Sequence, residues 1–457
     1  MTFNIPKEVL EVYKTFEKNS FEIYFIGGCV RNLLMDKPIK DWDLTTNATP
    51  QEIQTLFKDT FYDNSFGTVG IPIEINGEKK VAEVTTYRTE GTYSDNRRPD
   101  IVSWGKTIHE DLERRDFTIN AIALKIKKDE HELVDLFEGQ KDIENKVIRA
   151  VGDPKKRFKE DALRLMRAIR IATELSFTIE EQTFKEIKND APLLANVSGE
   201  RIRIELLRIL ESNFAYDGIM LLKNAGLLDY IIPELLEGVG VSQARPGRHH
   251  TTDVFTHNVM SLKECTSKDP IVRFAALIHD IGKPKVQSTD EEGLVIFHNH
   301  EIVGAKIARE ICERLKFSKK DKDKVVMLIR WHMFTVDEHI TDAAVRRFIR
   351  RVGVENVKDM MDLRIGDRLG GGTQNAESWR LKLFKKRIED QLAPAPFSIN
   401  DLAIDGNDIM KTLNMKPGPK VGEILQKLFE EVDENLELNE KEYLLKKAKE
   451  LNHDQDA

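Results

Sequence analysis

The chain has 457 residues, of which 40% are hydrophobic and 32% are charged, and its formal net charge is −8. This length exceeds one ordinary core and predicts about three domains, while the composition excludes a largely disordered chain. No apolar run approaches the roughly 18 residues that a membrane-spanning helix needs, and the first residues lack the pattern of a signal peptide. Three scattered cysteines, Cys29, Cys265 and Cys312, argue against a disulfide framework or a cysteine-based zinc site. We therefore expect a cytoplasmic protein with no membrane partner.

The negative net charge does not exclude a nucleic-acid partner, because phosphate binding depends on local clusters of Lys and Arg. Arginines are concentrated in five stretches: Arg97/Arg98, Arg114/Arg115, Arg164 to Arg170, Arg201 to Arg208, and Arg346 to Arg351.

The first 135 or so residues alternate short strand patterns with helical ones. Strands are expected at 22–28, 41–46, 70–75 and 81–87, and a helix at 50–57. From residue 153 onward apolar residues recur three and four apart, which predicts helices almost everywhere. Gly- and Pro-rich breaks at 238–250, 366–372 and 392–399 suggest domain edges. We divide the chain into residues 1–145, 146–240, 241–372 and 373–457.

The first candidate site combines glycines with carboxylates. Gly27 and Gly28 separate a predicted strand from a helix that carries Arg31, a geometry that can hold a phosphate but is also ordinary turn chemistry. Asp41 and Asp43 stand two apart within the next predicted strand, so both project from one face. Two adjacent carboxylates repel unless a cation lies between them, and Mg²⁺ with nucleotide phosphates suits such a site.

A third carboxylate belongs to the predicted strand VAEVTTY. Glu83 alternates inward there and is a candidate to complete a two-metal arrangement for phosphoryl transfer, although a strand Glu is often only an exposed surface residue.

These residues resemble the nucleotidyltransferase head of the DNA polymerase β type, in which the two aspartates bind Mg²⁺ and help to activate the attacking 3′-hydroxyl. Residues 86–123, which include TEGTYSDNRRP and RRDFTINA, are similar to the class II CCA-adding enzymes. The resemblance implies an α+β fold: a polymerase-β-like head with a small mixed sheet, then a mostly α-helical neck, an HD domain and a tRNA-binding tail. The segment INDLAIDGNDIMKTLNMKPGPKVGEIL resembles that tail.

In RRDFTINA, Arg114 and Arg115 are candidate ligands of the triphosphate or the primer. Asp116 is a candidate ligand of a ribose hydroxyl, and it is also a candidate helix N-cap. Asn120 is a candidate donor to the sugar or the backbone.

Asp161, Arg164, Arg167 and Arg170 recur every third residue in EDALRLMRAIR and therefore stay near one helical face. A carboxylate can accept from an exocyclic amine while an arginine donates to a ring atom, which distinguishes C and A from U and G. The resemblance supplies a counterpart, a base-reading Glu-Asp-x-x-Arg motif. An ordinary surface ion pair is the alternative.

A neck-like motif follows at 198–210. Ser198 is expected as a helix cap, and Arg201 and Arg203 as scaffold or tRNA-backbone contacts.

Eight of the eleven histidines fall between His249 and His339. Within this run, His257, His279-Asp280 and Asp367 resemble the pattern of HD phosphohydrolases, which implies a divalent metal of unknown identity. His300 and His332 are further candidates, either as ligands of a second metal or as residues that orient the first ligands.

We predict an enzyme that adds CCA to the 3′ end of tRNA from CTP and ATP, with Mg²⁺ in the head and an additional HD-type phosphohydrolase. An A-adding enzyme or a poly(A) polymerase shares the same head motifs and is the first alternative. An HD phosphohydrolase with a non-catalytic RNA-binding head and a non-enzymatic RNA-binding scaffold are the remoter ones. The oligomeric state stays open.

Overall fold

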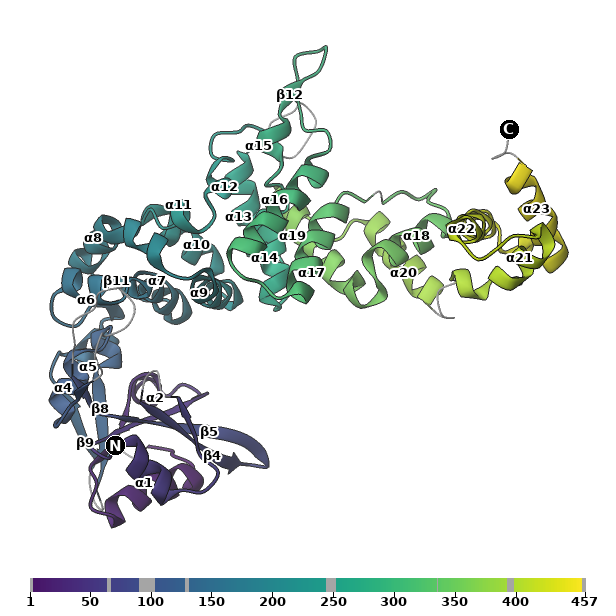
Figure 1. Ribbon diagram of the computed structural model, residues 1–457. Coiled ribbons are helices and arrows are strands. Elements are labelled where there is room, and N and C mark those ends of the chain that lie inside the picture. The colour runs from purple at the N-terminus through teal and green to yellow at the C-terminus, as the bar shows by residue number, and fades with distance from the viewer. Residues whose placement is uncertain are drawn as a thin grey trace. The chain divides into compact units, whose positions relative to one another are not determined.

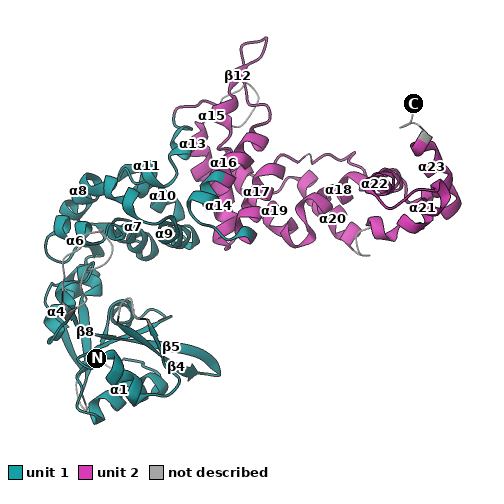
Figure 2. Cartoon of the chain, viewed as in Figure 1, with its two compact units in different colours: residues 1–239, 310–319 teal, residues 240–309, 320–457 magenta. Residues whose placement is uncertain are grey.

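The computed structural model describes residues 3–63, 67–89, 103–127, 131–243, 252–334, 336–392 and 398–453. It divides into two compact units (Figure 2). Unit 1 contains Met1–Val239 and Glu310–Lys319, and unit 2 contains Gly240–Arg309 and Lys320–Ala457. Each unit is described by itself below.

Unit 1 begins with a seven-stranded sheet in the order β3-β4-β5-β2-β1-β8-β9. Strands β4, β5, β8 and β9 are labelled in Figure 1. Strands β2 and β5 run parallel, whereas the other neighbours are antiparallel, so the sheet is mixed as the sequence predicts. The strands are β1 (Ile23–Ile26), β2 (Trp42–Thr46), β3 (Phe61–Asp63), β4 (Thr68–Ile75), β5 (Glu78–Thr86), β8 (Ile122–Ile126) and β9 (His131–Asp135). Two short strands, β6 (Arg88–Thr89) and β7 (Ser103–Trp104), form a separate pair.

The core of this head lies between the sheet and helix α1 (Lys7–Lys18). Val9, Tyr13 and Phe16 recur three and four apart in α1 and are fully buried. Trp42, the residue between Asp41 and Asp43, packs edge-on against Phe25 in the same core. The other helices of the head are α2 (Gly28–Leu34), α3 (Pro50–Leu56), α4 (Ile108–Glu113) and α5 (Gly139–Glu144).

Unit 1 continues as a helical neck. Its helices are α6 (Pro154–Glu160), α7 (Leu163–Leu175), α8 (Glu181–Asp190), α9 (Gly199–Glu211), α10 (Ala215–Asn224), α11 (Leu228–Ile231) and α12 (Pro233–Leu236), with a short parallel pair of strands, β10 (Val147–Ile148) and β11 (Thr178–Ile179). The single helix expected over EDALRLMRAIR is wrong. The chain is extended at Asp161, which separates α6 from α7 and accepts a hydrogen bond from the backbone N–H of Leu163. Ser198 stands at the start of α9, but its side chain makes no capping bond.

Unit 2 is almost entirely helical. Its helices are α13 (Val254–Glu264), α14 (Pro270–Ile278), α15 (Lys283–Val286), most of α16 (His300–Arg314), nearly all of α17 (Lys319–Trp331), α18 (Asp342–Val352), α19 (Val357–Gly370), α20 (Trp379–Leu392), α21 (Gly406–Leu413), α22 (Pro419–Glu434) and α23 (Lys441–His453), with a small hairpin of β12 (Ser288–Thr289) and β13 (Val295–Ile296). Helices α21, α22 and α23 share a hydrophobic core of their own. Among the described residues, no helix is long and apolar enough to cross a membrane.

Two of the four glycines of GDRLGGG, Gly366 and Gly370, lie inside a helix and not in the expected break. Helix α19 continues through Gly366 to Gly370 and packs against α13. A Cβ on Gly366 would stand 2.5 Å from the Ser261 carbonyl oxygen, and one on Gly370 would stand 2.6 Å from the Ser261 nitrogen. These two glycines let the helix backbones approach closely, because no side chain separates them.

Candidate active site and metal centre

Asp43 and Glu83 stand side by side on the sheet of the head. They are register partners on the parallel strands β2 and β5, so their side chains leave the same face. Asp41 precedes β2 by one residue and is exposed, so it is not within the strand as expected. The two aspartates nevertheless line one hollow together with Glu83.

Burial and like charge perturb these carboxyls. Burial, together with Glu83 and Asp41, raises the pKa of Asp43 to about 6, and Arg115 only partly opposes this shift. The pKa of Glu83 is raised as well, first by partial burial and then by Asp41. Carboxylates that repel one another at the floor of a hollow are a suitable ligand set for a divalent cation.

Gly27 allows the backbone to pass close to this group. Its φ is +76°, a conformation that side chains disfavour, and a Cβ there would lie 3.0 Å from Nη1 of Arg115 and 3.6 Å from Oδ2 of Asp43. In the helix that follows, Arg31 donates from Nη1 to Oδ1 of Asn120 at 2.8 Å.

Arg114 and Arg115 both pair with one buried carboxylate, that of Asp111. Asp111 accepts from Nη2 of Arg114 at 2.7 Å and from Nη2 of Arg115 at 3.1 Å. Burial alone would raise the pKa of Asp111, but the two arginines outweigh it and lower that pKa to about 2. Asp111 therefore stays charged and orients both guanidinium groups.

Asp116 does not cap a helix, because the predicted helix after it is a single 3₁₀ turn (Thr118–Asn120) followed by β8. Its carboxylate accepts instead from Asn120 at 3.3 Å and from Nη2 of Arg167 at 2.6 Å. Burial would raise the pKa of Asp116, but Arg167 holds it well below the usual range. This ion pair ties the head to helix α7.

The two residues expected to read the base do not pair with each other. Asp161 forms a two-pronged ion pair with Arg201, with distances of 3.2 and 2.8 Å. Arg164 donates to Oε2 of Glu160 at 2.7 Å and to the backbone carbonyl of Arg114 at 2.9 Å. Each side chain is thus oriented by a separate partner. Arg170 is buried and paired with Glu205 at 2.5 Å.

Two adjoining hollows of unit 1 collect these side chains. One, of about 650 Å³, is lined by Asp43, Glu83, Arg114, Arg115, Asp116, Asp161, Arg164 and Arg167, among others. The other, of about 990 Å³, is lined by Gly28, Arg31, Asp41, Asp43, Glu83, Asn120, Arg167 and Arg170, among others. Of the residues predicted for the nucleotide site, all except Gly27 line one or both.

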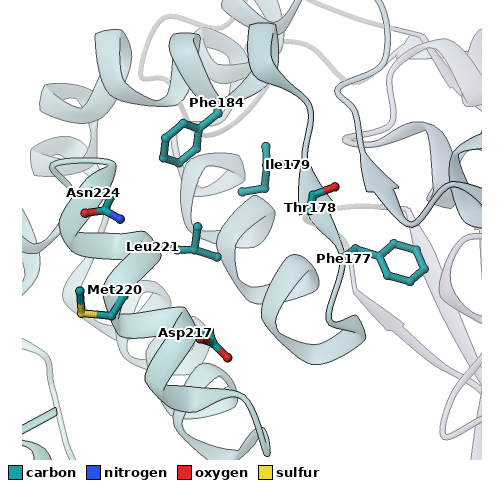
Figure 3. Close-up of a pocket in the computed structure, with 8 residues that line it drawn as sticks. All are labelled: Phe177, Thr178, Ile179, Phe184, Asp217, Met220, Leu221 and Asn224. Carbon is teal, nitrogen blue, oxygen red and sulfur yellow. The ribbon is translucent and has the colours of Figure 1, made fainter. Parts of the chain in front are cut away.

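Another hollow of unit 1 contains none of these residues. It lies among α8, α10 and β11, and Asp217 is the single acidic side chain of a mostly apolar wall that includes Phe184 and Leu221 (Figure 3). Its chemistry does not suit a triphosphate.

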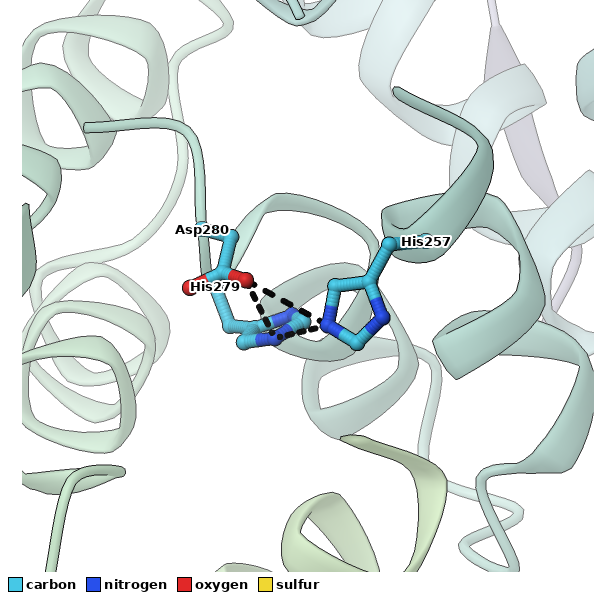
Figure 4. Close-up of side chains that lie close together, drawn as sticks. All are labelled: His257, His279 and Asp280. Atoms are coloured by element: carbon cyan, nitrogen blue, oxygen red, sulfur yellow. Dashed lines mark hydrogen bonds and ion pairs between the residues drawn. The ribbon is translucent and has the colours of Figure 1, made fainter. Parts of the chain in front are cut away.

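The predicted histidine and aspartate cluster is assembled in unit 2 from several helices. His257 comes from α13, His279 and Asp280 follow α14, and Asp367 comes from α19. Nε2 of His257 lies 3.2 Å from Nε2 of His279, 3.3 Å from Oδ2 of Asp280 and 3.3 Å from Oδ1 of Asp367. Figure 4 shows the first three of these side chains pointing toward one another.

A second group meets the other oxygen of Asp280. Nε2 of His300 lies 3.2 Å and Nε2 of His332 lies 3.6 Å from Oδ1 of Asp280, and the two imidazole nitrogens are 3.3 Å apart. Asp280 therefore offers one carboxylate oxygen to each group.

The donor set fits divalent metal ions. Bonds of about 2.1 Å to one ion place neighbouring ligand atoms about 3.0 to 3.4 Å apart, close to the separations above. Nδ1 of His279, His300 and His332 faces a backbone carbonyl oxygen at 2.9, 2.8 and 2.7 Å. A proton on Nδ1 satisfies that carbonyl and leaves the Nε2 lone pair directed into the cluster.

The charged groups of the cluster shift one another's pKa values. Burial would lower the pKa of His279, but Asp280 and Asp367 raise it to about 10. Burial also lowers the pKa of His332. Lys283 reaches Oδ2 of Asp280 at 2.5 Å, so a cation already neutralises this carboxylate.

Sequence reasoning missed the residues that orient the site. Asp111 lies three and four residues before the arginines that it holds, so helical spacing was an available signal there. Glu160 lies four residues before Arg164, but the extended Asp161 interrupts the helix between them. Arg201 was expected only as a scaffold or tRNA contact, and its pairing with Asp161 spans 40 residues of sequence. Most of the TEGTYSDNRRP loop, residues 90–99, lies outside the described residues.

Comparison with known proteins places this geometry in a family. Residues 23–149 match the poly(A) polymerase head domain, residues 176–238 the probable RNA- and SrmB-binding site of polymerase A, and residues 286–448 the second domain of tRNA nucleotidyltransferases. A CCA-adding enzyme of Ligilactobacillus salivarius is 32% identical over 98% of both chains. The chain belongs to the CCA-adding enzyme family of nucleotidyltransferases.

One relative has a different named activity, and a solved structure extends the likeness over almost the whole chain. An A-adding tRNA nucleotidyltransferase of Deinococcus radiodurans is 37% identical over 72% of this chain and 76% of its own. The crystal structure of the Bacillus stearothermophilus CCA-adding enzyme in complex with CTP is 26% identical, covers 98% of both chains and superposes with a TM-score of 0.68.

Proposed function

We propose that the head and neck add cytidine and adenosine to the 3′ end of tRNA from CTP and ATP, without a nucleic-acid template. The observation that carries this proposal is that one cavity is lined both by the carboxylates Asp43 and Glu83 and by the candidate base readers Asp161 and Arg164. A metal site alone suits many phosphoryl transfers. A cavity that holds both the carboxylates and the two candidate base-reading residues suits selective nucleotide addition.

In this proposal Asp41, Asp43 and Glu83 hold Mg²⁺, which neutralises the triphosphate and favours the ionised 3′-hydroxyl of the primer. Arg114 and Arg115, oriented by Asp111, bind the phosphates. The primer 3′-oxygen forms a bond to the α-phosphorus while the bond from that phosphorus to the bridging oxygen breaks, and pyrophosphate leaves. Asp116, held by Arg167, remains charged to accept from a ribose hydroxyl.

Base selection is assigned to Asp161 and Arg164. C and A both present an exocyclic amine, which donates to a carboxylate, whereas U and G present a carbonyl oxygen at the matching position. A carbonyl oxygen facing Asp161 would leave two acceptors opposed, which is unfavourable in a partly buried site. Arg201 fixes the orientation of Asp161, and Glu160 that of Arg164.

We expect the purified protein with Mg²⁺ to extend a tRNA lacking its 3′ end with CTP and ATP, and to use UTP or GTP at least about a hundredfold less efficiently, as expected for one opposed buried pair. The extension rate is measured on three tRNAs, which end before the CCA, after C and after CC. Each tRNA is incubated with one nucleotide at a time. Similar rates with all four nucleotides would contradict base reading by Asp161 and Arg164.

The same assay separates the alternatives. The Deinococcus relative named above supports an A-adding activity as the second candidate. An A-adding enzyme would extend only the tRNA ending in CC, and only with ATP. A poly(A) polymerase would continue beyond the first adenosine.

We also propose that the cluster in unit 2 binds two divalent metal ions, one at His257, His279, Asp280 and Asp367 and the other at Asp280, His300 and His332, and that it hydrolyses phosphate esters. The ligand separations and the Nδ1 hydrogen bonds support this assignment. Hydrolysis adds water across the ester: the water oxygen bonds to phosphorus, the ester P–O bond breaks, and the leaving oxygen takes a proton.

We further propose that residues 1–145, 146–240, 241–372 and 373–457 act as head, neck, HD domain and tRNA-binding tail.

His279→Ala should abolish metal-stimulated hydrolysis of a phosphomonoester or a 2′,3′-cyclic nucleotide and leave nucleotide addition unchanged, because His279 belongs to unit 2 alone. His298→Ala is the matched control, since that side chain is exposed in the same unit. Bound Mn²⁺, measured by equilibrium dialysis, should fall in the first variant and not in the second. Hydrolysis retained by His279→Ala would remove this assignment.

A further inference from the structure

The row of side chains that contains Asp43 and Glu83 continues across the sheet of the head to its edge. Gly70 on β4 is the register partner of Glu83, and Phe61 on the edge strand β3 is the register partner of Gly70. With the pairing of Asp43 and Glu83, these contacts place four residues of adjacent strands in one row. All four line the hollow of about 650 Å³, and Phe61 is the outermost.

Gly70 makes room for the ring of Phe61. A Cβ on Gly70 would stand 2.2 Å from both Cε2 and Cζ of Phe61, so any side chain at that position would displace the ring. The ring therefore occupies the place of a side chain on β4. It extends from its own strand toward Glu83, which lies on the next strand, β5.

The ring of Phe61 does not belong to the core of the head. Tyr62 packs against that core, whereas Phe61 projects from the opposite face of the strand and is 55% exposed. The rest of the hollow is rich in carboxylates and arginines. An exposed aromatic ring at the wall of such a charged hollow is a surface on which a nucleic-acid base stacks.

The candidate phosphate ligands lie on the other side of Asp43. Nη1 of Arg115 is beside Gly27, which follows β1, and β1 neighbours β2 on the side away from β5. In phosphoryl transfer the attacking and leaving oxygens are roughly in line across the phosphorus. A pyrophosphate that leaves toward Arg115 therefore requires a primer 3′-oxygen that approaches from the side of Glu83 and Phe61.

Two hydroxyl groups line the hollow next to this row. Thr68 and Thr85 lie two residues from Gly70 and Glu83 on the same strands, so they share the face of the row. Their Oγ1 atoms are 3.2 Å apart. Hydroxyl groups both donate and accept, so this pair suits the ribose of a nucleotide whose base lies on the ring.

We propose that Phe61 is the platform on which the last base of the tRNA primer stacks, and that it thereby positions the primer 3′-hydroxyl over Glu83. The proposal rests on the nucleotide addition proposed above and assigns the primer to the β3–β4 side of the carboxylates. Stacking accepts every base, because every base has a π face. One platform can therefore hold the different primer ends of successive additions, while Asp161 and Arg164 select the incoming base.

A fluorescent base at the primer end tests the platform without catalysis. A tRNA ending in CC, with 2-aminopurine in place of its last base, should lose fluorescence on binding the full-length protein, because the base stacks. Phe61→Leu keeps an apolar side chain without a π face and should remove this quenching, and Phe61→Tyr should retain it. Tyr230→Leu is the matched control, since it removes an exposed aromatic ring from α11, and it should quench like the wild type.

Extension kinetics separate stacking from a structural role of the ring. Phe61→Leu should lower kcat/KM for a tRNA ending in CC by about tenfold, as expected for one stacked base, and leave the KM for ATP unchanged. A second tRNA has a last nucleotide that lacks its base but keeps its 3′-hydroxyl. On this tRNA the variant and the wild type should be equally active, because no base is left to stack.

Each possible result bears on one of the two proposals. Undiminished quenching by Phe61→Leu, or an equal loss of activity on the intact and the base-free tRNA, would overturn the platform. A raised KM for ATP would place the incoming base on Phe61 and would also overturn it. Quenching that depends on Phe61 in a protein that extends no tRNA would instead refute nucleotide addition, and with it the positioning of the 3′-hydroxyl, but would support the stacking surface.

Discussion

Replacing Asp43 with Asn should lower the kcat of nucleotide addition by about a thousandfold, which corresponds to about 4 kcal/mol of transition-state stabilisation. Asn preserves the shape of the side chain but removes the negative charge from a half-buried position that also feels the charges of Glu83 and Asp41. The loss should be large because the bound metal supplies several kcal/mol to phosphoryl transfer. The rate of addition is measured by single-turnover extension of a tRNA ending in CC with labelled ATP.

The matched control for this variant is Asp59→Asn. Asp59 is exposed in the same head and has a φ of +58°, a conformation that Asn adopts as readily as Asp. It should retain full activity. Both variants should bind tRNA like the wild type in a gel-shift assay, because the substitution at Asp43 removes no positive charge. Activity within tenfold of the wild type in Asp43→Asn would favour a head that binds RNA without catalysing addition.

Replacing Gly370 with Ala should destabilise unit 2 and weaken its metal site. The new methyl group would lie 2.6 Å from the Ser261 nitrogen, a backbone atom that cannot move independently of α13. Overpacking of this kind costs about 1 to 3 kcal/mol. Because α13 carries His257 and α19 carries Asp367, separating these helices also spreads the ligands.

Gly422→Ala provides the opposite control within the same unit. Gly422 is in helix α22 and a Cβ there would meet nothing within 4 Å, so this change should stabilise the helix by about 0.5 to 1 kcal/mol. Hydrogen exchange of α13 and α19 peptides and Mn²⁺ affinity are the measurements. Unchanged protection and affinity in Gly370→Ala would show that the close helix contact is not required.

The local patterns of the sequence were sufficient for the class of fold and for the strands of the head that carry candidate site residues. Alternation with a period of two predicts the strands that carry Asp43 and Glu83, and a period near 3.6 predicts the helices after residue 153. These signals are local, since a strand or helix buries one face according to its own residues. The spacing of Asp41 and Asp43 predicted a shared strand face, but Asp41 precedes the strand, and the two carboxylates meet only in lining one hollow.

Only the tertiary structure decided which partner each charged residue has. Asp161 and Arg164 look like one pair in the sequence, yet Arg201 holds the first and Glu160 the second. The glycines of GDRLGGG look like a break, yet Gly366 and Gly370 allow close contact of α19 with α13. The physical reason is the same in both cases. Hydrogen bonds and van der Waals contacts act over a few ångströms in space, and the chain brings together residues 40 or 100 positions apart, which no local periodicity encodes.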